Sequence, residues 1–334
     1  MYFQDEFGLP FDEADFGDSL QCHSTPNVWE AHTQSIARVK PGSRGEHAFD
    51  ARGDAIGTIT ITSAEKGATE LEYSIVLRVE DKAMLDKIHI TYPSPEEALD
   101  EISRMRLTTA RNPSLTSCIR YDVTIAVPEH MNKLHVASHT ATHVRFDPDA
   151  ELELKQLFVT LYSMDTRNLI VAHERFTATK KMALEVYRGK IVGDVSIIDQ
   201  TTVKTQRGDG VVDVRAIPSP PKDTRNPEPA IFETTTGFGR TNVVYVDDEQ
   251  GVHRPIRARH VSSRKGPITV SYEKAAFSGL VELVASNDEV LGEQVHPYPA
   301  GSKDGTADWT HYVGSLSGKD EIHVNSRGQA TLRF

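Results

Sequence analysis

The sequence predicts an all-β protein, most of which forms a β-solenoid, also called a parallel β-helix. Segments in which apolar and polar residues alternate, as half-buried strands require, follow one another along the chain. Tight glycine turns separate them, as in residues 203–214 around Gly208. Similar turns recur at roughly 20–30 residue intervals, a spacing typical of stacked repeats. Their glycines are Gly189, Gly208, Gly237 and Gly266.

These observations divide the chain into three parts. Residues 1–20 are expected to be a disordered acidic tail, residues 21–120 a β-rich N-terminal region, and residues 121–334 the β-solenoid repeat domain. An antiparallel sandwich of hairpins is the alternative, because the same glycine turns would also suit it. Insertions in the repeat are expected to form loops that carry the binding function. The main ones are residues 218–229 and 296–309.

The tail and the start of the β-rich region have distinct patterns. Acidic residues with interspersed phenylalanines, the last of them Phe16, offer too little apolar surface to offset the entropy of ordering. A docking segment with the phenylalanines as anchors is the alternative. Further on, residues 56–62 and 71–79 both alternate and flank a turn at Gly67, which predicts a β-hairpin.

Residues 94–106 carry the signals of one short helix. Ser94 suits the N-cap, and Glu97 three residues later completes a capping box. Pro95 fits the first helical position. Ile102 and Met105 continue an apolar face at helical spacing. We expect this helix to cover the edge of a sheet and protect its unpaired backbone groups.

Composition excludes some classes of partner. The chain has 334 residues and a formal net charge of -11. Nucleic acid and anionic lipid bind through dense lysine and arginine, so neither is expected as the main partner. No apolar run reaches the roughly 20 residues of a membrane helix, so no membrane insertion is expected. No signal peptide is visible, which predicts an intracellular protein by default, or a cell-surface one if a leader is removed.

The cysteines and histidines are candidates for disulfide formation and for metal binding. Cys22 and Cys118 are interpreted as a pair of free thiols, with a single bridge as the alternative. His135, His139 and His143 share one strand face by their spacing, yet they would lie too far apart for one metal ion unless the chain bends. We interpret the three histidines as exposed polar positions.

The acidic residues are candidates for calcium binding and for catalysis. Calcium could bind Asp147 with Asp149, or the run at residues 247–249, but neither matches a known loop pattern. Lyases and hydrolases of polysaccharides need carboxylates, or a basic residue, converging on one groove. The candidates for such a groove, which we expect instead to be ordinary outward charges, are Asp194, Lys204, Asp213 and Arg215. No catalytic, cofactor-binding or metal-binding residue is therefore assigned, and no cofactor is expected.

A strand that ends in Val-Pro opens the repeat domain. It occupies residues 121–128, and later segments follow the form V-x-x-x-x-G-x-V/I-x-V. This combination resembles the "putative auto-adhesin" family of β-solenoids, which includes bacterial envelope proteins and fungal proteins of unassigned role. The resemblance covers about residues 120–334 and implies a scaffold with a role in surface adhesion, without catalytic residues. We therefore expect a non-enzymatic, adhesin-like binding scaffold with a protein or glycan partner. A carbohydrate-active β-helix enzyme, either a polysaccharide lyase or a hydrolase, is the alternative.

Overall fold

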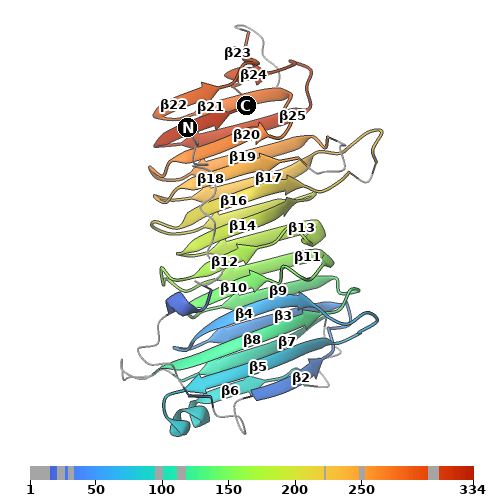
Figure 1. Ribbon diagram of the computed structural model, residues 1–334, viewed down its shortest axis with the longest axis vertical. Coiled ribbons are helices and arrows are strands. Elements are labelled where there is room, and N and C mark those ends of the chain that lie inside the picture. The colour runs from blue at the N-terminus through green and yellow to red at the C-terminus, as the bar shows by residue number, and fades with distance from the viewer. Residues whose placement is uncertain are drawn as a thin grey trace, which may run out of the picture. The chain divides into compact units, whose positions relative to one another are not determined.

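A computed structural model describes residues 16–20, 27–28, 34–94, 101–110, 118–221, 223–247, 253–299 and 308–334. The chain divides into two compact units. The first unit is residues 11–190, and the second unit is residues 191–334 together with residues 1–10. In each unit the described strands form two mostly parallel sheets, here called sheet A and sheet B, which confirms the all-β class (Figure 1).

The first unit holds the strands β1 to β13. In spatial order, its sheet A consists of β1 (Asn27–Val28), β5 (Leu71–Val79), β8 (Ile119–Val127), β4 (Ile56–Ser63), β10 (Thr142–Phe146) and β12 (Leu169–Ala172), and β2 (Gln34–Val39) also pairs with β5. Its sheet B consists of β13 (Phe176–Val186), β11 (Leu152–Leu161), β9 (Lys133–Ser138), β3 (Glu46–Arg52), β7 (Ile102–Thr109) and β6 (Ile88–Thr91). Apolar residues alternate inward along these strands, as in β5 and β8, where every second residue is buried.

The predicted hairpin between residues 56–62 and 71–79 is wrong. These segments are the strands β4 and β5, but β8 lies between them in sheet A. β8 pairs in parallel with β4 and antiparallel with β5. Because β8 buries every second residue over nine positions, it matches the alternation of both neighbours.

The predicted helix over residues 94–106 is also wrong, because Ile102 begins strand β7. In β7, Ser103, Met105 and Leu107 are buried, while Arg104 is exposed between them. A period of two, with a charged residue directed outward, therefore overrides the helical spacing. Residues 95–100 lie outside the described residues. The helices that the structure describes are short 3₁₀ segments, η2 (Asp18–Leu20) and η3 (Lys82–Lys87).

The second unit continues the alternation between two sheets. In spatial order, its sheet A consists of β14 (Lys190–Ile197), β16 (Val211–Pro218), β18 (Thr241–Val246), β20 (Ile268–Lys274), β26 (Gln329–Arg333) and β22 (Asn287–Leu291). Its sheet B consists of β15 (Thr201–Thr205), β17 (Ala230–Thr236), β19 (Ile256–Ser262), β25 (Asp320–Ser326), β21 (Gly279–Val284), β24 (His311–Val313) and β23 (Val295–Pro297). Successive strands from β14 to β20 thus belong to opposite sheets, and each pairs with a strand two positions along the chain.

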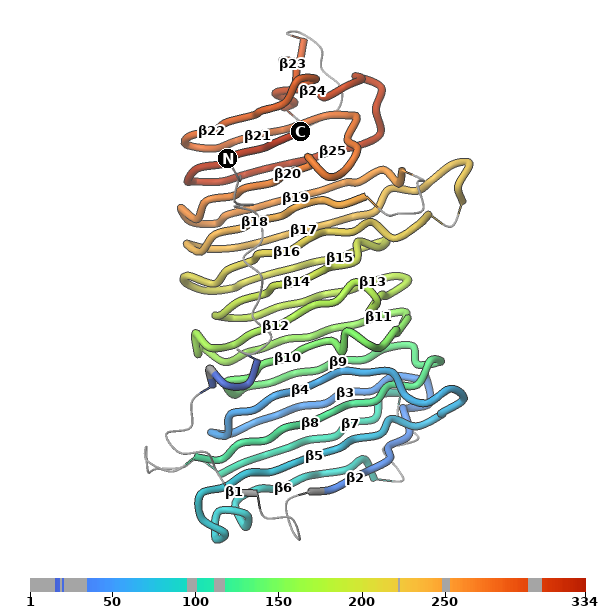
Figure 2. Tube along the Cα trace, viewed as in Figure 1, coloured from blue at the N-terminus to red at the C-terminus, as the bar shows by residue number. Residues whose placement is uncertain are grey.

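The glycine turns of the second unit stack on one another. Figure 2 shows the turns between β15 and β16, β17 and β18, and β19 and β20 at the same side of this unit. The amide of Phe238 donates to the carbonyl of Gly208 at 2.8 Å, and the amide of Gly266 to that of Gly237 at 3.1 Å. These turns connect two sheets rather than two paired strands. The alternative of an antiparallel sandwich of hairpins is therefore wrong for them.

Aromatic side chains fill the interior of the second unit in the same stacked manner. The rings of Tyr245 and Tyr272 lie 4.1 Å apart and nearly parallel, and Tyr272 stacks on Phe334 at 5.3 Å. All but Phe334 are almost fully buried. Such offset stacks add to the free energy gained from apolar burial.

Cys118, next to the first residue of β8, is disulfide-bonded. Cys22, the only other cysteine in the sequence, lies outside the described residues. The interpretation of the cysteines as free thiols is therefore wrong. In the part of the chain that the structure describes, no helix is long and apolar enough to cross a membrane.

Candidate functional site

The candidate site lies on the outward face of sheet B in the first unit, on β3, β9, β11 and β13. Parallel pairing places residues of equal register in rows across the strands. Glu46 is the partner of Lys133, Lys133 of Gln156, and Gln156 of Lys181. One row of the face therefore presents four polar or charged side chains in sequence.

A β-bulge adds further cations to this row. The pairing of β11 with β13 shifts after Leu154. Lys155 and Gln156 follow one another in β11, and Lys180 and Lys181 in β13, yet none of the four is buried. A strict alternation would direct one residue of each pair into the core. The bulge instead turns consecutive residues outward, as bulges near functional sites often do.

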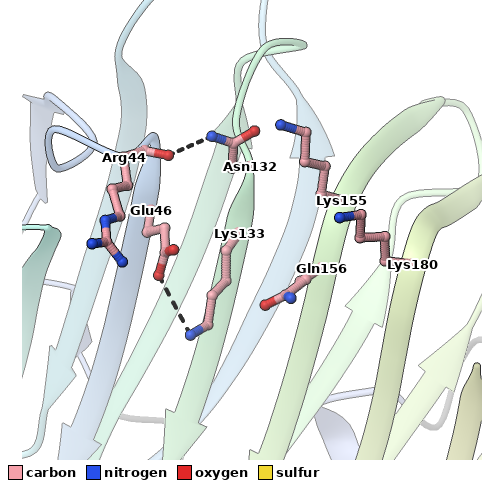
Figure 3. A pocket seen from close by; sticks show the side chains of 7 residues that line it. All are labelled: Arg44, Glu46, Asn132, Lys133, Lys155, Gln156 and Lys180. Atoms are coloured by element: carbon pink, nitrogen blue, oxygen red, sulfur yellow. Dashed lines mark hydrogen bonds and ion pairs between the residues drawn. The ribbon is translucent and has the colours of Figure 1, made fainter.

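These residues line a cleft with a volume of about 290 Å³ (Figure 3). The lining residues are Arg44, Glu46, Asn132, Lys133, Lys155, Gln156 and Lys180. Four of them are cationic and one is a carboxylate, so the lining carries a net charge of three positive at neutral pH.

Two of the four cations have internal partners. Arg44 pairs with Glu101, and the Lys133 Nζ lies 3.5 Å from Glu46 Oε2. Lys155 and Lys180 are exposed and form no ion pair with any described residue. Figure 3 shows the Lys155 side chain extending toward Asn132 and the Lys180 side chain extending toward Lys155.

A tight loop before β3 fixes the rim of the cleft. Gly45 has φ +69°, and its amide donates to the Gly42 carbonyl at 2.7 Å. The Asn132 amide donates to the Gly45 carbonyl at 2.7 Å, and the Asn132 side chain donates to the carbonyl of Arg44. A side chain at position 45 would be strained in this conformation, so glycine is needed there.

Phe158 occupies the next row of the face. The Lys133 Nζ lies 5.5 Å from the centre of its ring and the Lys181 Nζ 6.0 Å, from the strands on either side. His135 meets the same ring at 5.9 Å with an edge-on geometry. Cation–π attraction therefore holds the ammonium groups of Lys133 and Lys181 beside the Phe158 ring, next to the row of charged residues.

An aromatic row crosses the face at the opposite ends of the strands. His139 stacks on Tyr162 at 4.6 Å, and Tyr162 meets Tyr187 at 5.3 Å. The backbone amides of His139, Tyr162 and Tyr187 donate, in that order, to the carbonyl oxygens of Ala51, Ser138 and Leu161 at 2.7–2.8 Å. These hydrogen bonds extend the parallel pairing of the strands by one residue. This spacing holds the three rings at neighbouring strand positions.

Asp50 lies between the Phe158 row and the aromatic row. Only 6% of the residue is exposed. Its Oδ2 accepts from Arg52 Nε at 2.7 Å, and the carboxylate raises the pKa of Arg52. Its Oδ1 is buried without a hydrogen-bond partner and lies 3.6 Å from His139 Nε2. This oxygen is closed off from solvent, so Asp50 acts on the face through Arg52 and His139 rather than by direct contact with a ligand.

The three histidines considered as metal ligands do not converge. His135 and His139 belong to the outward face of sheet B, whereas His143 lies in β10 of sheet A. The expectation of exposed polar positions is wrong for His143, which is 1% exposed and whose Nδ1 accepts from the Gly17 amide at 3.0 Å. Burial lowers the pKa of His143 to about 4. The described residues contain no cluster of potential metal ligands.

The residues considered for catalysis lie in the second unit, and both carboxylates among them are paired with arginines. Asp194 binds Arg215, with one contact at 2.6 Å, and Asp213 Oδ2 accepts from Arg240 at 2.9 Å. Lys204 lies on β15, in the other sheet from these pairs. Because each carboxylate is neutralised by an arginine, these residues form cross-strand ion pairs rather than an open acidic groove.

The acidic turns also have structural partners. Asp147 accepts from the Thr62 hydroxyl at 2.9 Å and from the Asp149 amide at 3.1 Å. Asp247 accepts from the Ala276 amide at 2.8 Å, while residues 248 and 249 lie outside the described residues. The carboxylates of Asp147 and Asp247 thus cap turns, as expected for solvated acidic turns.

The two loops expected to carry binding differ in how they are held. Arg254, only 8% exposed, fixes the loop after β16 by donating to the carbonyls of Glu228 at 3.0 Å and Ser219 at 3.3 Å. In the other loop, residues 300–307 lie outside the described residues. Trp309 contacts His323 at 4.9 Å. Neither loop contributes to the cleft.

Sequence reasoning missed Lys155, Lys180, Tyr162, Tyr187 and Asp50. One signal was available, since residues 152–157 and 178–182 break the strict alternation with consecutive polar residues. Such a break inside a strand pattern indicates a bulge. The register that brings the four strands together carries no comparable signal in a single sequence.

Comparisons with known proteins give no family. No family model and no curated protein match the chain. Among solved structures, one from Clostridium sporogenes ATCC 15579, described as a "putative cell adhesion protein", is 12% identical with a TM-score of 0.29, covering 90% of this chain and 98% of that chain. A "putative adhesin" from Bacteroides fragilis NCTC 9343 is 12% identical with a TM-score of 0.45, covering 90% and 95%.

A third solved structure, a "putative adhesin" from Parabacteroides merdae ATCC 43184, is 11% identical with a TM-score of 0.24, covering 71% of this chain and 93% of that chain. All three TM-scores lie below 0.5. The described roles of these proteins are therefore not transferred to this chain.

Proposed function

We propose that the chain is a non-enzymatic, adhesin-like binding scaffold whose ligand meets the outward face of β3, β9, β11 and β13. One observation carries this proposal. The same face presents a cationic cleft with two exposed lysines, Lys155 and Lys180, and a row of aromatic rings held in register. Rigid strands position both features, as a preformed binding surface requires.

The proposed architecture of the scaffold is a β-solenoid. Strands β14 to β20 alternate between two sheets and pair in parallel with the strands of the next repeat. The turn glycines and the interior aromatic rings of successive repeats stack on one another in the second unit. A solenoid of this kind offers long, flat faces on which strand spacing sets the separation of side chains.

Binding without turnover is favoured over hydrolysis by the placement of the carboxylates on this face. Asp50 and Glu185 share one row but lie on β3 and β13, with β9 and β11 between them. At about 4.8 Å per strand, their Cα atoms are about 14 Å apart. Pairs of catalytic carboxylates in glycosidases are separated by about 5–9.5 Å. Glu46, the carboxylate of the cleft, is already paired with Lys133.

The disulfide supports a location outside the reducing cytosol. Cys118 is disulfide-bonded. Structural disulfides persist in oxidising compartments and are rare in the cytosol. An adhesin-like scaffold would work at a cell surface, where this bond is stable.

A binding screen of the purified chain on glycan and polysaccharide arrays, with product analysis of every hit, tests the proposal. We expect binding without cleavage, unaffected by EDTA because the described residues hold no metal cluster. The double variant Tyr162→Ala/Tyr187→Ala should abolish binding, whereas Tyr92→Ala, an exposed tyrosine outside this face, should not. Cleavage of a bound glycan, or binding that survives the double variant, would contradict the proposal.

A further inference from the structure

We propose that the ligand of this face is an acidic polysaccharide, whose carboxylate or sulfate groups bind in the cleft at Lys155 and Lys180. This inference rests on the proposed function and specifies its ligand. The sugar units that follow would lie over Phe158 toward Asp50 and the aromatic row, Tyr162 and Tyr187.

The charge of the cleft selects an anion. The chain as a whole has a formal net charge of -11, yet the cleft lining is positive. Arg44 and Lys133 already face carboxylates, while Lys155 and Lys180 form no ion pair among the described residues. Two adjacent ammonium groups repel one another, and an anionic group between them would remove that repulsion through charge-assisted hydrogen bonds.

The rest of the face selects a sugar polymer. Phe158 and the stacked pair of His139 and Tyr162 offer ring faces on which sugar rings can pack. Tyr162 and Tyr187 present rings and hydroxyls together, the combination that binds amphipathic groups. From Gln156 to Tyr162 the face extends about 20 Å along β11, at about 3.3 Å per residue. A single sugar would not span that distance, whereas a chain of sugars would.

Nucleic acid fits the same face less well. It binds through the neutralisation of many phosphates by lysine and arginine. Beyond the cleft the described face presents the ion pair of Asp50 with Arg52 and the aromatic row, which neutralise no phosphates. An acidic polysaccharide with spaced anionic groups needs cations only at the cleft, and its sugar rings can pack on the aromatic row.

Two matched pairs of polymers test the inference by biolayer interferometry with the full chain. One pair is partly and fully methyl-esterified polygalacturonate, and the other is lightly sulfated dextran and dextran, so the anionic groups are spaced along the polymer and the arms separate carboxylate from sulfate. The variant Lys155→Gln/Lys180→Gln should weaken binding of the acidic polymer by about tenfold or more. Lys66→Gln/Lys265→Gln removes the same charge at exposed positions outside the cleft and should leave affinity unchanged. Circular dichroism of both variants checks that the fold is intact.

Tighter binding to one or both acidic polymers than to their neutral partners, lost only in the cleft variant, supports the inference. Equal loss in the control variant would show a bulk charge effect and overturn it. Equal affinity for a single-stranded oligonucleotide, or for the neutral polymers, would also overturn it. If a neutral glycan or a protein binds in a manner that depends on Tyr162 and Tyr187, the proposed function stands while this inference fails. If no ligand depends on the face, both fail.

Discussion

At the scale of single residues, the side chain of Asn168 links several backbone segments of the first unit. It is fully buried at the start of β12. Its Nδ2 lies 2.8–2.9 Å from the carbonyl oxygens of Ser163, Asp165 and Arg188. Its Oδ1 accepts from the Thr142 amide at 3.2 Å. One side chain thus contacts backbone groups of three separate segments, at residues 142, 163–165 and 188.

Asn168→Ala should destabilise the first unit strongly. The substitution leaves several buried backbone groups without partners, and each such group costs about 1–3 kcal/mol. We expect the free energy of unfolding to fall by about 3 kcal/mol or more, measured as a shift of the urea midpoint by circular dichroism. Asn226→Ala, at an exposed asparagine, is the control and should change it by less than about 0.5 kcal/mol. Equal midpoints for the two variants would show that the Asn168 contacts contribute nothing.

At the scale of elements, the turns between sheets depend on glycine because their backbones touch. A Cβ atom at Gly239 would lie 2.1 Å from the carbonyl oxygen of Gly210. At Gly266 it would lie 2.2 Å from the carbonyl oxygen of Gly239. Real side chains do not approach backbone oxygens so closely. These glycines are therefore required by the approach of one turn to the next.

Gly239→Ala tests whether glycine is needed because neighbouring turns pack closely, rather than because a turn needs a left-handed backbone conformation. The added methyl group forces neighbouring repeats apart. Overpacking costs about 1–3 kcal/mol, and we expect the upper end of that range here because the clash is with backbone. Gly67→Ala is the matched comparison, because Gly67 has φ +84° but open space around it. Its cost should be that of the left-handed conformation alone, about 1 kcal/mol. Thermal melting of both variants measures the difference, and a larger loss for Gly67→Ala would contradict the stacking argument.

The same elements show what a single sequence can predict. Period-two alternation gives the strands, as in β8 and β16, and the repeated glycines give the stacked turns. Pairing partners are not contained in these local patterns, so β8 between β4 and β5 was missed. Residues 102–106 satisfy both a helical and a strand period, and only the neighbouring strand β3 selects the latter.

The candidate site could not be predicted from the sequence either, because its residues come from separate strands. Its lysines and aromatic rings come from strands β9, β11 and β13, which are far apart in sequence. Only the parallel register brings them into rows. The expected binding loops, by contrast, were conspicuous in composition, since residues 218–229 are rich in proline. The structure shows that Arg254 fixes that loop from within the second unit.

At the scale of the whole molecule, each unit buries a histidine between a hydroxyl group and a tyrosine. In the first unit, His47 Nδ1 lies 2.6 Å from Ser103 Oγ, and its Nε2 2.7 Å from the Tyr73 hydroxyl. In the second unit, the corresponding distances of His260 are 2.8 Å to Thr234 Oγ1 and 3.0 Å to the Tyr245 hydroxyl. Neither histidine is exposed, so the arrangement is a structural one in the interior.

These two histidines make stability depend on pH in both units. Burial lowers the pKa of His47 and of His260 to about 3, while an unfolded chain has a histidine pKa of about 6.5. Between those values the unfolded state binds more protons than the native state. Stability is therefore greatest above pH 6.5 and falls as the pH is lowered. At pH 5 each histidine should cost about 2 kcal/mol.

Burial also lowers the pKa of His143, to about 4, and the pKa of His135, so these two histidines add to the loss of stability in the same pH range. Two further groups act outside it. His253 hydrogen-bonds Asp320, which raises its pKa, so its contribution is complete below pH 6.5 and is lost only as the pH rises through its folded value. Hydrogen bonds from Arg167 lower the pKa of Asp165, whose contribution is lost in more acidic solution, below about pH 4. The range from pH 6.5 to 5 therefore reports mainly on buried histidines.

Urea unfolding at pH 7.5, 6.5, 5.5 and 5 measures this dependence. We expect the midpoint to stay level down to about pH 6.5 and then to fall steeply. His47→Gln and His260→Gln keep a hydrogen-bonding side chain that cannot be protonated, so each should reduce the slope below pH 6.5, whatever its effect at pH 7.5. His89→Gln replaces an exposed histidine and should leave the slope unchanged. A midpoint that stays level from pH 6.5 to 5 would mean that the interior accommodates the charged imidazolium, and that the two buried networks are not neutral in the native state.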